Sequence, residues 1–265
     1  MNLFIDYDFK TVMNNTNEIQ KIAKKLKESS SILFITGAGL SADSGLPTYR
    51  GIGGIYNDNN TEDGYSIEEA LSGKMLQQHP EITWKYLAQV EQAGREASFN
   101  IGHEIITKFE SLLPRVWILT QNIDGFHRAA GSKNIIDIHG DIHFLECTQC
   151  NDKFEIKNFL GFEMPPLCKK CDGNIRPQVV LFGEMLPTDK LSLYQQQLEQ
   201  GFDIIFSIGT TSVFPYISAP IYQANHNTLT IEINPSQTEV SSVVKIKINE
   251  KAKDFLPQLW AAVSL

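Results

Sequence analysis

Ser31-Ile-Leu-Phe-Ile-Thr36 is an apolar run of strand length, and it leads directly into Gly37-Ala38-Gly39. Such a run is typical of a buried strand. A strand that ends in a glycine turn and a helix start is typical of a dinucleotide phosphate site. Glycine lets the backbone approach the pyrophosphate, and the N–H groups of the helix start face the anion. Gly45 follows Gly39 by six residues, which departs from the G-x-G-x-x-G spacing. The glycines alone therefore fit a plain tight turn equally well.

Apolar runs of strand length recur along the chain, at residues 116–120, 135–138, 203–208, 229–233 and 245–248. Apolar residues at helical spacing predict helices at residues 17–28, 102–112 and 189–200. Strands that alternate with helices indicate a mostly parallel sheet with helices on both faces. The sequence therefore predicts an α/β fold, a Rossmann-like doubly wound parallel sheet.

Two segments interrupt this alternation, at residues 51–101 and 141–175. The first contains no good strand; it begins with a loop rich in Gly, Asn and Asp and continues with helical patterns. The second holds all four cysteines. We expect both segments to be insertions that together form a smaller domain, a helical module plus a zinc ribbon. The Rossmann-like domain then comprises residues 1–50, 102–140 and 176–265.

The four cysteines form two C-x-x-C pairs, Cys147 with Cys150 and Cys168 with Cys171. The spacing between the pairs is typical of a zinc ribbon. Four thiolates complete a tetrahedron around zinc at Zn–S distances of roughly 2.3 Å and leave no open position, so the metal would be structural. Free thiols or a redox pair are the alternatives. Because the start of the chain shows no export signal, we do not expect disulfides.

The chain of 265 residues carries a formal net charge of −8 at pH 7. An acidic chain is a poor general nucleic-acid binder, because that affinity depends on Lys and Arg neutralising phosphates. The charge mildly favours basic partners, although many intracellular proteins are this acidic for solubility alone. No apolar run approaches the roughly 20 residues of a membrane helix. We therefore expect a cytoplasmic protein that binds neither nucleic acid directly nor a membrane; the sequence leaves its oligomeric state open.

More specific motifs follow the glycine turn. Residues 37–50 resemble the sirtuin signature GAG-x-S-x-x-S-G-[I/L]-P-x-[F/Y]-R. Further segments match the sirtuin family in its own order: TQNID at 120–124, HG at 139–140, the two cysteine pairs, FGE-x-LP at 182–187, GT at 209–210 and EIN at 232–234. These matches span most of the chain, and chance does not account for so many ordered motifs.

The resemblance to sirtuins implies a reaction and its substrates. Sirtuins transfer an acyl group from a protein lysine to the ADP-ribose of NAD, which gives nicotinamide and O-acyl-ADP-ribose. This chemistry needs a base for a ribose hydroxyl, and a neutral imidazole with a pKa of about 6.5 suits that task. We expect the base to be His139, which follows an apolar run at the edge where ligands collect in a parallel sheet. A lone histidine is otherwise more simply structural, as we expect for His79, His103, His127, His143 and His226.

The resemblance also implies which residues contact NAD. Asp124 is assigned to the nicotinamide carboxamide and Asn122 to the ribose region, and we count both with His139 as catalytic. A helix cap is the plainer role for such an Asn or Asp. Tyr49 would shield the reactive sugar carbon, and the fork of Arg50 suits phosphate oxygens. The complete set of expected NAD contacts is Gly37, Ala38, Gly39, Ser41, Tyr49, Arg50, Gln121, Asn122, Ile123, Asp124, Gly209, Thr210 and Asn234.

The acyl-lysine substrate is expected between the two domains, where residues 179–184 would pair with its backbone by strand addition. The expected contacts are Val180, Phe182, Gly183 and Glu184. Sirtuins that prefer acidic acyl groups carry Tyr-x-x-Arg on a helix of the small domain, at the positions of Leu87 and Val90 here. Neither side chain binds a carboxylate, so we expect a neutral acyl preference, for acetyl or a longer aliphatic chain.

Other functions fit parts of the sequence. An NAD hydrolase or ADP-ribosyltransferase on the same scaffold would release nicotinamide without acyl-lysine. A non-enzymatic zinc-ribbon module for nucleic acid would need a basic face, which the sequence of this acidic chain does not indicate. A hydride-transferring dehydrogenase would explain the glycine turn, but neither the Asn122 and Asp124 pair nor a closed four-thiolate site. The loop at 209–215, one residue shorter than is usual in sirtuins, would lie beside the adenosine half of NAD.

Overall fold

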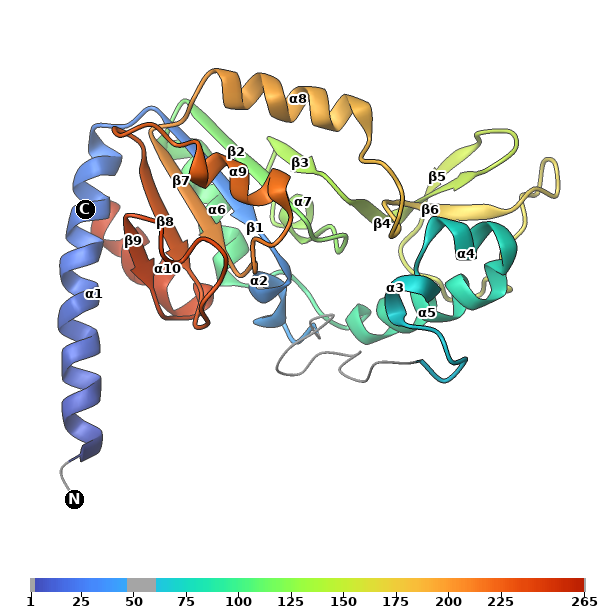
Figure 1. Cartoon of the computed structure of the whole chain (residues 1–265), viewed down its shortest axis with the longest axis horizontal. Helices are drawn as coiled ribbons and strands as arrows, with labels where there is room; N and C mark the ends of the chain where they lie inside the picture. The colour runs from blue at the N-terminus through green and yellow to red at the C-terminus, as the bar shows by residue number, and fades with distance from the viewer. Residues whose placement is uncertain (1–2, 47–60, 265) are drawn as a thin grey trace.

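The computed structural model describes residues 3–46 and 61–264, and the side chains from residue 15 onward. Its centre is a six-stranded sheet in the order β3-β2-β1-β7-β8-β9 (Figure 1). Every neighbouring pair in this sheet is parallel. The strands are β1 (Ser31–Thr36), β2 (Arg115–Thr120), β3 (Ile135–Asp137), β7 (Ile204–Ile208), β8 (Leu229–Ile233) and β9 (Ile246–Ile248).

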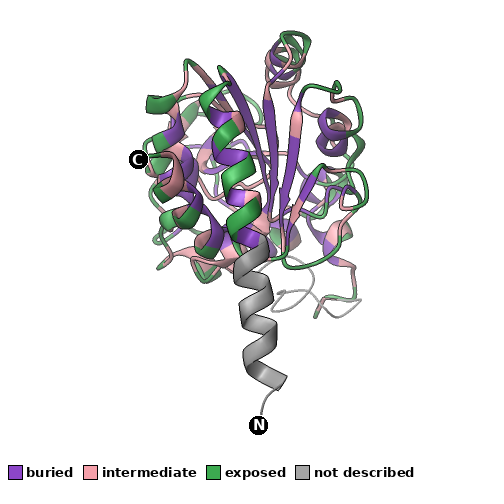
Figure 2. Ribbon diagram, turned by 90° about the vertical axis from the view of Figure 1, so that its left-hand side faces the viewer, coloured by how far each residue is buried: buried purple, intermediate pink, exposed green. Residues whose placement is uncertain are grey.

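Helices cover both faces of this sheet, and the buried strands lie between them (Figure 2). Successive side chains of a strand point to opposite faces, so Ile32 and Phe34 of β1 pack on one face, and Leu33 and Ile35 on the other. The first face is covered by α1 (Leu3–Lys27), α6 (Ile101–Leu112) and α10 (Ala252–Val263), and the second by α8 (Thr188–Glu199) and α9 (Pro215–Tyr222). The predicted fold class, a doubly wound parallel α/β sheet, is confirmed.

The observed elements differ from the predicted ones mainly at helix α1. The predicted strands of the large sheet agree with the observed ones to within one residue at each end. Helix α1 begins at Leu3, well before the predicted start at residue 17. The prediction followed the apolar spacing of Ile19, Ile22 and Leu26, and these side chains pack on the core.

A second, three-stranded antiparallel sheet lies beside the first, in the order β5-β4-β6. Its strands are β4 (Gly140–Cys147), β5 (Lys153–Glu155) and β6 (Ile175–Val179), and three helices pack on it: α3 (Ile67–Ala70), α4 (Gly73–Gln78) and α5 (Pro80–Gly94). We call these elements the small unit. One apolar cluster joins Trp84 and Leu87 of α5 to Leu145 of β4. Strand β6 crosses the boundary that the sequence suggested at residue 175.

The strand order reverses at β1, which lies between β2 and β7. In open parallel sheets, ligands bind outside the carboxyl ends of the strands at such a switch point. Here that place is formed by the chain just after Thr36 of β1 and just after Ile208 of β7. The small unit lies beside the sheet at the end where β4 continues from β3 (Figure 1).

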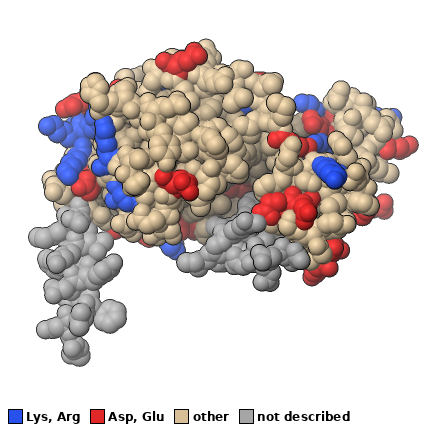
Figure 3. Space-filling view, viewed as in Figure 1, with Lys and Arg blue, Asp and Glu red and all other residues tan. Residues whose placement is uncertain are grey.

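The charges on one face are unevenly spread. Figure 3 shows a group of basic side chains at the end of the molecule where α1 lies, while further basic side chains and the acidic ones are scattered over the same face. The last turn of α1 carries Lys24, Lys25 and Lys27. Among the described residues, no helix is both long and apolar enough to span a bilayer.

Candidate active site

The glycine turn after β1 packs tightly against the loop after β7. A Cβ on Gly37 would come within 2.7 Å of the Thr210 side chain, and one on Gly39 within 2.7 Å of the Gly209 Cα. The Gly37 amide donates to the Ile208 carbonyl, and the Gly39 amide donates to the Gly209 carbonyl at 2.8 Å. These glycines are therefore required by the protein's own packing. Because the N–H groups of Gly37 and Gly39 already donate to these carbonyl oxygens, a bound anion would have to accept hydrogen bonds from other N–H groups of the turn.

A polar chain of side chains lies at the same edge of the sheet. The Ser41 hydroxyl, on the short helix α2 (Ala38–Ala42), donates to Asp124 at 2.5 Å and accepts from the Asn122 amide at 3.0 Å. Asn122 also donates to the Gly37 carbonyl at 3.1 Å. The loop after β2 is thereby tied to the turn after β1, and three predicted site residues are brought together.

Asp124 is a partly buried carboxyl group with a raised pKa. Burial raises its pKa, and the hydrogen bonds from Ser41 and from the Phe126 amide partly oppose that rise. The Phe126 amide belongs to the first turn of α7 (Phe126–Ala129) and lies 2.9 Å from Asp124. The N-cap residue of α7 is Gly125, so this contact lies one residue before the cap position and Asp124 does not fill the cap role that the sequence allowed. The other carboxylate oxygen accepts the hydrogen bond from Ser41.

His139 is fixed by both of its ring nitrogens. Nδ1 lies 3.0 Å from the Gln121 carbonyl oxygen, and Nε2 lies 2.6 Å from the Tyr216 hydroxyl. A carbonyl can only accept, so Nδ1 carries the hydrogen and the neutral ring has its lone pair on Nε2. Burial lowers the pKa of His139, with a smaller opposing effect from the Gln121 carbonyl. The imidazole is therefore held neutral with one defined basic nitrogen.

Gln121 connects His139 to the loops that follow β7 and β8. Its side-chain amide donates to the Thr210 hydroxyl at 2.7 Å. The Asn234 side chain in turn donates to the Thr210 carbonyl at 3.1 Å. The loops after β2, β7 and β8 are thus joined in one network that includes Gly209. Of the predicted NAD contacts, Tyr49 and Arg50 lie outside the described residues.

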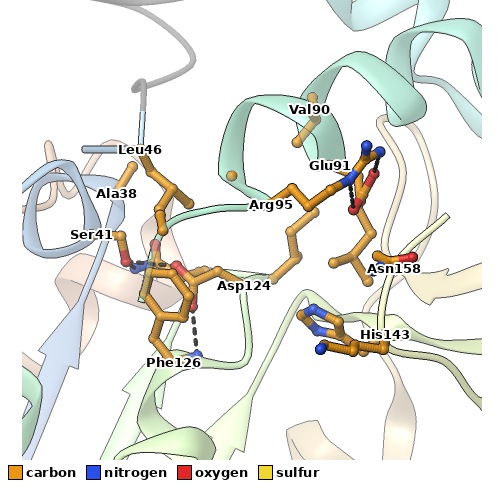
Figure 4. A pocket seen from close by; sticks show the side chains of 16 residues that line it. Ala38, Ser41, Leu46, Val90, Glu91, Arg95, Asp124, Phe126, His143 and Asn158 are labelled. Carbon is orange, nitrogen blue, oxygen red and sulfur yellow. Dashed lines mark hydrogen bonds and ion pairs between the residues drawn. The ribbon is translucent and has the colours of Figure 1, made fainter. Parts of the chain in front are cut away.

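A cavity of about 160 Å³ opens beside this network. Figure 4 shows Ala38, Ser41 and Asp124 on one side of it and Val90 and Glu91 of α5 on the other. Ile123 also lines it. The described lining does not include His139, which is joined to it through the adjoining residues Gln121 and Asn122. The cavity therefore spans the interval between the large sheet and the small unit.

Helix α5 contributes both apolar and charged groups near this cavity. Val90 lines it, whereas Leu87 is 2% exposed within the core of the small unit. One turn on, Arg95 makes two hydrogen bonds to Glu91, whose side chain is only 6% exposed. The Glu91 and Arg95 pair was not predicted. Their spacing of four residues on a helix could have signalled a pair, but nothing local signals that it faces a cavity.

The predicted strand-addition segment is largely occupied by its own contacts. The Val180 amide donates to the His139 carbonyl and the Phe182 amide to the Leu71 carbonyl. The Glu184 carboxylate accepts from the Leu181 amide at 2.9 Å and pairs with Arg176 at 2.7 Å. Phe182 itself is 42% exposed. An incoming strand would have to pair with what remains of this backbone, chiefly at Gly183.

The four cysteines converge at one point of the small unit. Their Sγ atoms all lie within 4.8 Å of one another, with 3.5 Å between Cys147 and Cys171 and 3.6 Å between Cys150 and Cys168. Four soft sulfur donors at these separations fit a tetrahedral zinc ion with no ligand position left open. The donor set therefore fits the structural zinc that the spacing predicted.

Two aromatic residues around His139 were missed by the sequence reasoning. Phe214 and Tyr216 stack on each other with ring centroids 5.6 Å apart and planes 16° apart, and both meet the His139 ring edge-on. Residue 216 is 77 positions from His139 along the chain. No periodicity or motif brings such positions together, so only the fold reveals the contact.

A nucleotide-handling α/β enzyme with a separate four-thiol metal site is the class of protein that this geometry defines. The family model for the Sir2 family matches residues 37–215, and the chain belongs to that family. NAD-dependent protein deacylase 2 of Pseudomonas aeruginosa is 45% identical over 251 residues, covering 93% of this chain and 98% of that protein. NAD-dependent protein deacylase of Aquifex aeolicus is 35% identical and covers 88% of this chain and 95% of its own length.

Solved structures agree with this assignment. A Sir2 homologue in complex with NAD has a TM-score of 0.82 and 34% identity, over 92% of this chain and 93% of that one. A Sir2 variant bound to a deacetylated p53 peptide and 3′-O-acetyl ADP ribose has a TM-score of 0.80 and 26% identity, over 92% of this chain and 97% of that one. The predicted family is confirmed.

Proposed function

We propose that this chain removes acyl groups from protein lysines and consumes NAD, giving nicotinamide, free lysine and O-acyl-ADP-ribose with the uptake of one water. The observation that carries the proposal is the state of His139. Its Nδ1–H donates to the Gln121 carbonyl, so the basic lone pair of the neutral ring is on Nε2, at the sheet edge where nucleotides bind. A ribose hydroxyl that gives its proton to Nε2 becomes the nucleophile for the acyl carbon.

The polar chain from Asn122 through Ser41 to Asp124 would hold the other reacting end of NAD. Asp124 is partly buried, and an acceptor oxygen there suits the N–H of a carboxamide. Ile123 and Ala38 line the cavity beside it, and apolar walls keep water from the electron-poor sugar carbon. Asn122 would then orient the ribose. The division of the chain into a Rossmann-like domain and a small domain remains part of this proposal, with substrate bound between them.

The acyl preference proposed is for neutral groups. Val90 supplies an apolar wall of the cavity, and Arg95 is neutralised by a buried partner, Glu91. An acyl carboxylate would have to displace Glu91 from Arg95 and would leave that buried carboxylate without its cation, which costs about 3–5 kcal/mol. Acetyl or a longer aliphatic group meets no such penalty.

Mass spectrometry of acetyl-, succinyl- and myristoyl-lysine peptides incubated with NAD tests the proposal. We expect acyl-ADP-ribose from the acetyl peptide with the wild-type protein and none with His139→Ala. His226→Ala, at an exposed histidine, is the matched control and should remain active. Nicotinamide release without any acyl-lysine peptide would instead support an NAD hydrolase. Transfer of ADP-ribose to protein would support an ADP-ribosyltransferase.

The cell compartment proposed is the cytoplasm. Four free thiols grouped as metal ligands are kept reduced there, whereas an oxidising compartment would convert them to disulfides. The partners proposed are acyl-lysine proteins. The acidic net charge of −8 favours lysine-rich segments over nucleic acid.

A further inference from the structure

The basic nitrogen of His139 is covered by a tyrosine in this structure. With Nδ1–H committed to the Gln121 carbonyl, the only lone pair of the neutral ring is on Nε2. That atom lies 2.6 Å from the Tyr216 hydroxyl. The hydroxyl must therefore be the donor and Nε2 the acceptor. The atom that the proposed reaction needs as base is already engaged by the protein.

Tyr216 is held in this position by its surroundings. It is in the first turn of α9, directly after Pro215, and its carbonyl accepts from the Tyr194 hydroxyl at 2.7 Å. Its ring stacks on Phe214. Burial raises the pKa of Tyr216 to about 12, so the phenol stays protonated and remains a donor near neutral pH. The contact with His139 is thus a built feature of the site.

We propose that Tyr216 is a positioning residue that caps His139 Nε2 in the free enzyme and is displaced from it by a ribose hydroxyl of the bound nucleotide. The inference rests on the proposed function and deepens it. The Gln121 carbonyl sets the tautomer with hydrogen on Nδ1, and the cap satisfies a half-buried nitrogen that would otherwise lack a defined partner. Nucleotide binding must then exchange one hydrogen bond for another, by a turn of either ring.

The cap has a measurable cost, which Tyr216→Phe removes. Phenylalanine retains the stacking on Phe214 and loses only the hydroxyl. One net hydrogen bond is worth about a two- to ten-fold change in an equilibrium constant. We therefore expect Tyr216→Phe to bind ADP-ribose about two- to ten-fold more tightly in calorimetry and to lower KM for NAD by the same factor. Saturated turnover should stay within about two-fold. Tyr222→Phe, on the same helix with its hydroxyl on the Glu239 carbonyl, is the matched control and should change neither.

A merely structural tyrosine would not alter the histidine ring, so nitrogen NMR of the imidazole is the second measurement. In the free wild-type protein, the His139 signals should report hydrogen on Nδ1 and a hydrogen-bonded Nε2. In Tyr216→Phe, Nε2 should lose the hydrogen-bonded shift while Nδ1 keeps its hydrogen.

Three results would overturn the cap. They are unchanged or weaker ADP-ribose binding by Tyr216→Phe, a ten-fold or greater fall in turnover at unchanged KM, and a free enzyme with its hydrogen on Nε2. The second result would instead support a proton relay through the Tyr216 oxygen. A wild-type protein that releases no nicotinamide with any acyl peptide would refute the proposed function, and the NMR experiment would still decide the cap.

Discussion

Acid should destabilise this fold through two buried histidines. His103 of α6 and His127 of α7 are 0% and 3% exposed, and their rings lie 4.9 Å apart. His103 Nδ1 accepts a hydrogen bond from the backbone N–H of Asn100, and His127 Nε2 is hydrogen-bonded to the Thr36 hydroxyl. Their remaining ring nitrogens are buried and have no hydrogen-bond partner in the described structure. A proton added to either ring would therefore be a buried charge.

The size of this loss of folding stability follows from the pKa of His103. Burial lowers it from 6.5 to about 4, so the unfolded chain binds this proton first as the pH falls. The folded state therefore has its full stability above pH 6.5, and the part that depends on a neutral His103 is lost as the pH drops towards 4. A pKa lowered from 6.5 to about 4 corresponds to roughly 3 kcal/mol of stability in total, of which about 2 kcal/mol is lost by pH 5. Burial lowers the pKa of His127 as well, with a smaller effect from His103.

Urea unfolding from pH 7.5 to 5.0 of the wild-type protein and of His103→Gln measures this loss. Glutamine can accept from the Asn100 amide but does not titrate. The free energy of unfolding should therefore fall about 2 kcal/mol less for the variant over this range. Acid also weakens thiolate ligation of zinc, but that loss is common to both proteins and cancels in the difference. Parallel curves for the two proteins would refute the reasoning.

Three further predictions concern other parts of the molecule. Gly140→Ala should cost several kcal/mol, at least about 3, because φ is +88° and the new Cβ would lie 1.9 Å from the Gln178 oxygen. Gly131→Ala, with φ +98° and 3.7 Å to its nearest neighbour, should cost only about 1 kcal/mol, and equal melting temperatures would contradict this. A strong chelator should remove one zinc per chain and lower the melting temperature, as should Cys168→Ser; a metal-free protein of unchanged melting temperature would show that the four thiols stabilise nothing. Glu91→Gln should raise the ratio of desuccinylation to deacetylation by about ten-fold, since it frees Arg95 for an acyl carboxylate, and an unchanged ratio would exclude the pair from acyl selection.

Local patterns predicted the scaffold well because its strands are buried on both faces. Residues 31–36 and 204–208 are mostly apolar and are buried at every position. Such runs, in a chain with alternating helices, are typical of strands in a parallel sheet. Helix α1 shows the limit of the approach, because it begins at Leu3 whereas the predicted helix began at residue 17.

The sequence suggested residues for the candidate site but could not suggest their contacts. His139 and Asp124 followed from the resemblance, yet the partner of each is set by the fold. The hydroxyl on His139 comes from Tyr216, and the donor to Asp124 comes from Ser41 on a different strand-end loop. The sequence likewise did not indicate that, in the segment proposed for strand addition, the Leu181 amide donates to the Glu184 carboxylate.

The proposed chemistry and the proposed acyl selection lie on different parts of the fold. Ser41, Asn122 and Asp124 are held by loops at the edge of the large sheet and bond to one another. Val90 and Glu91 reach the same cavity from α5, whose buried face packs in the core of the small unit. Because the two sets share a cavity but no hydrogen bond among those described, substitutions on α5 can alter which acyl group is accepted without disturbing the groups that hold the nucleotide. Acyl preference can therefore vary among proteins that keep the same sheet-edge loops, and the residues of α5 that line the cavity have to be compared to predict it.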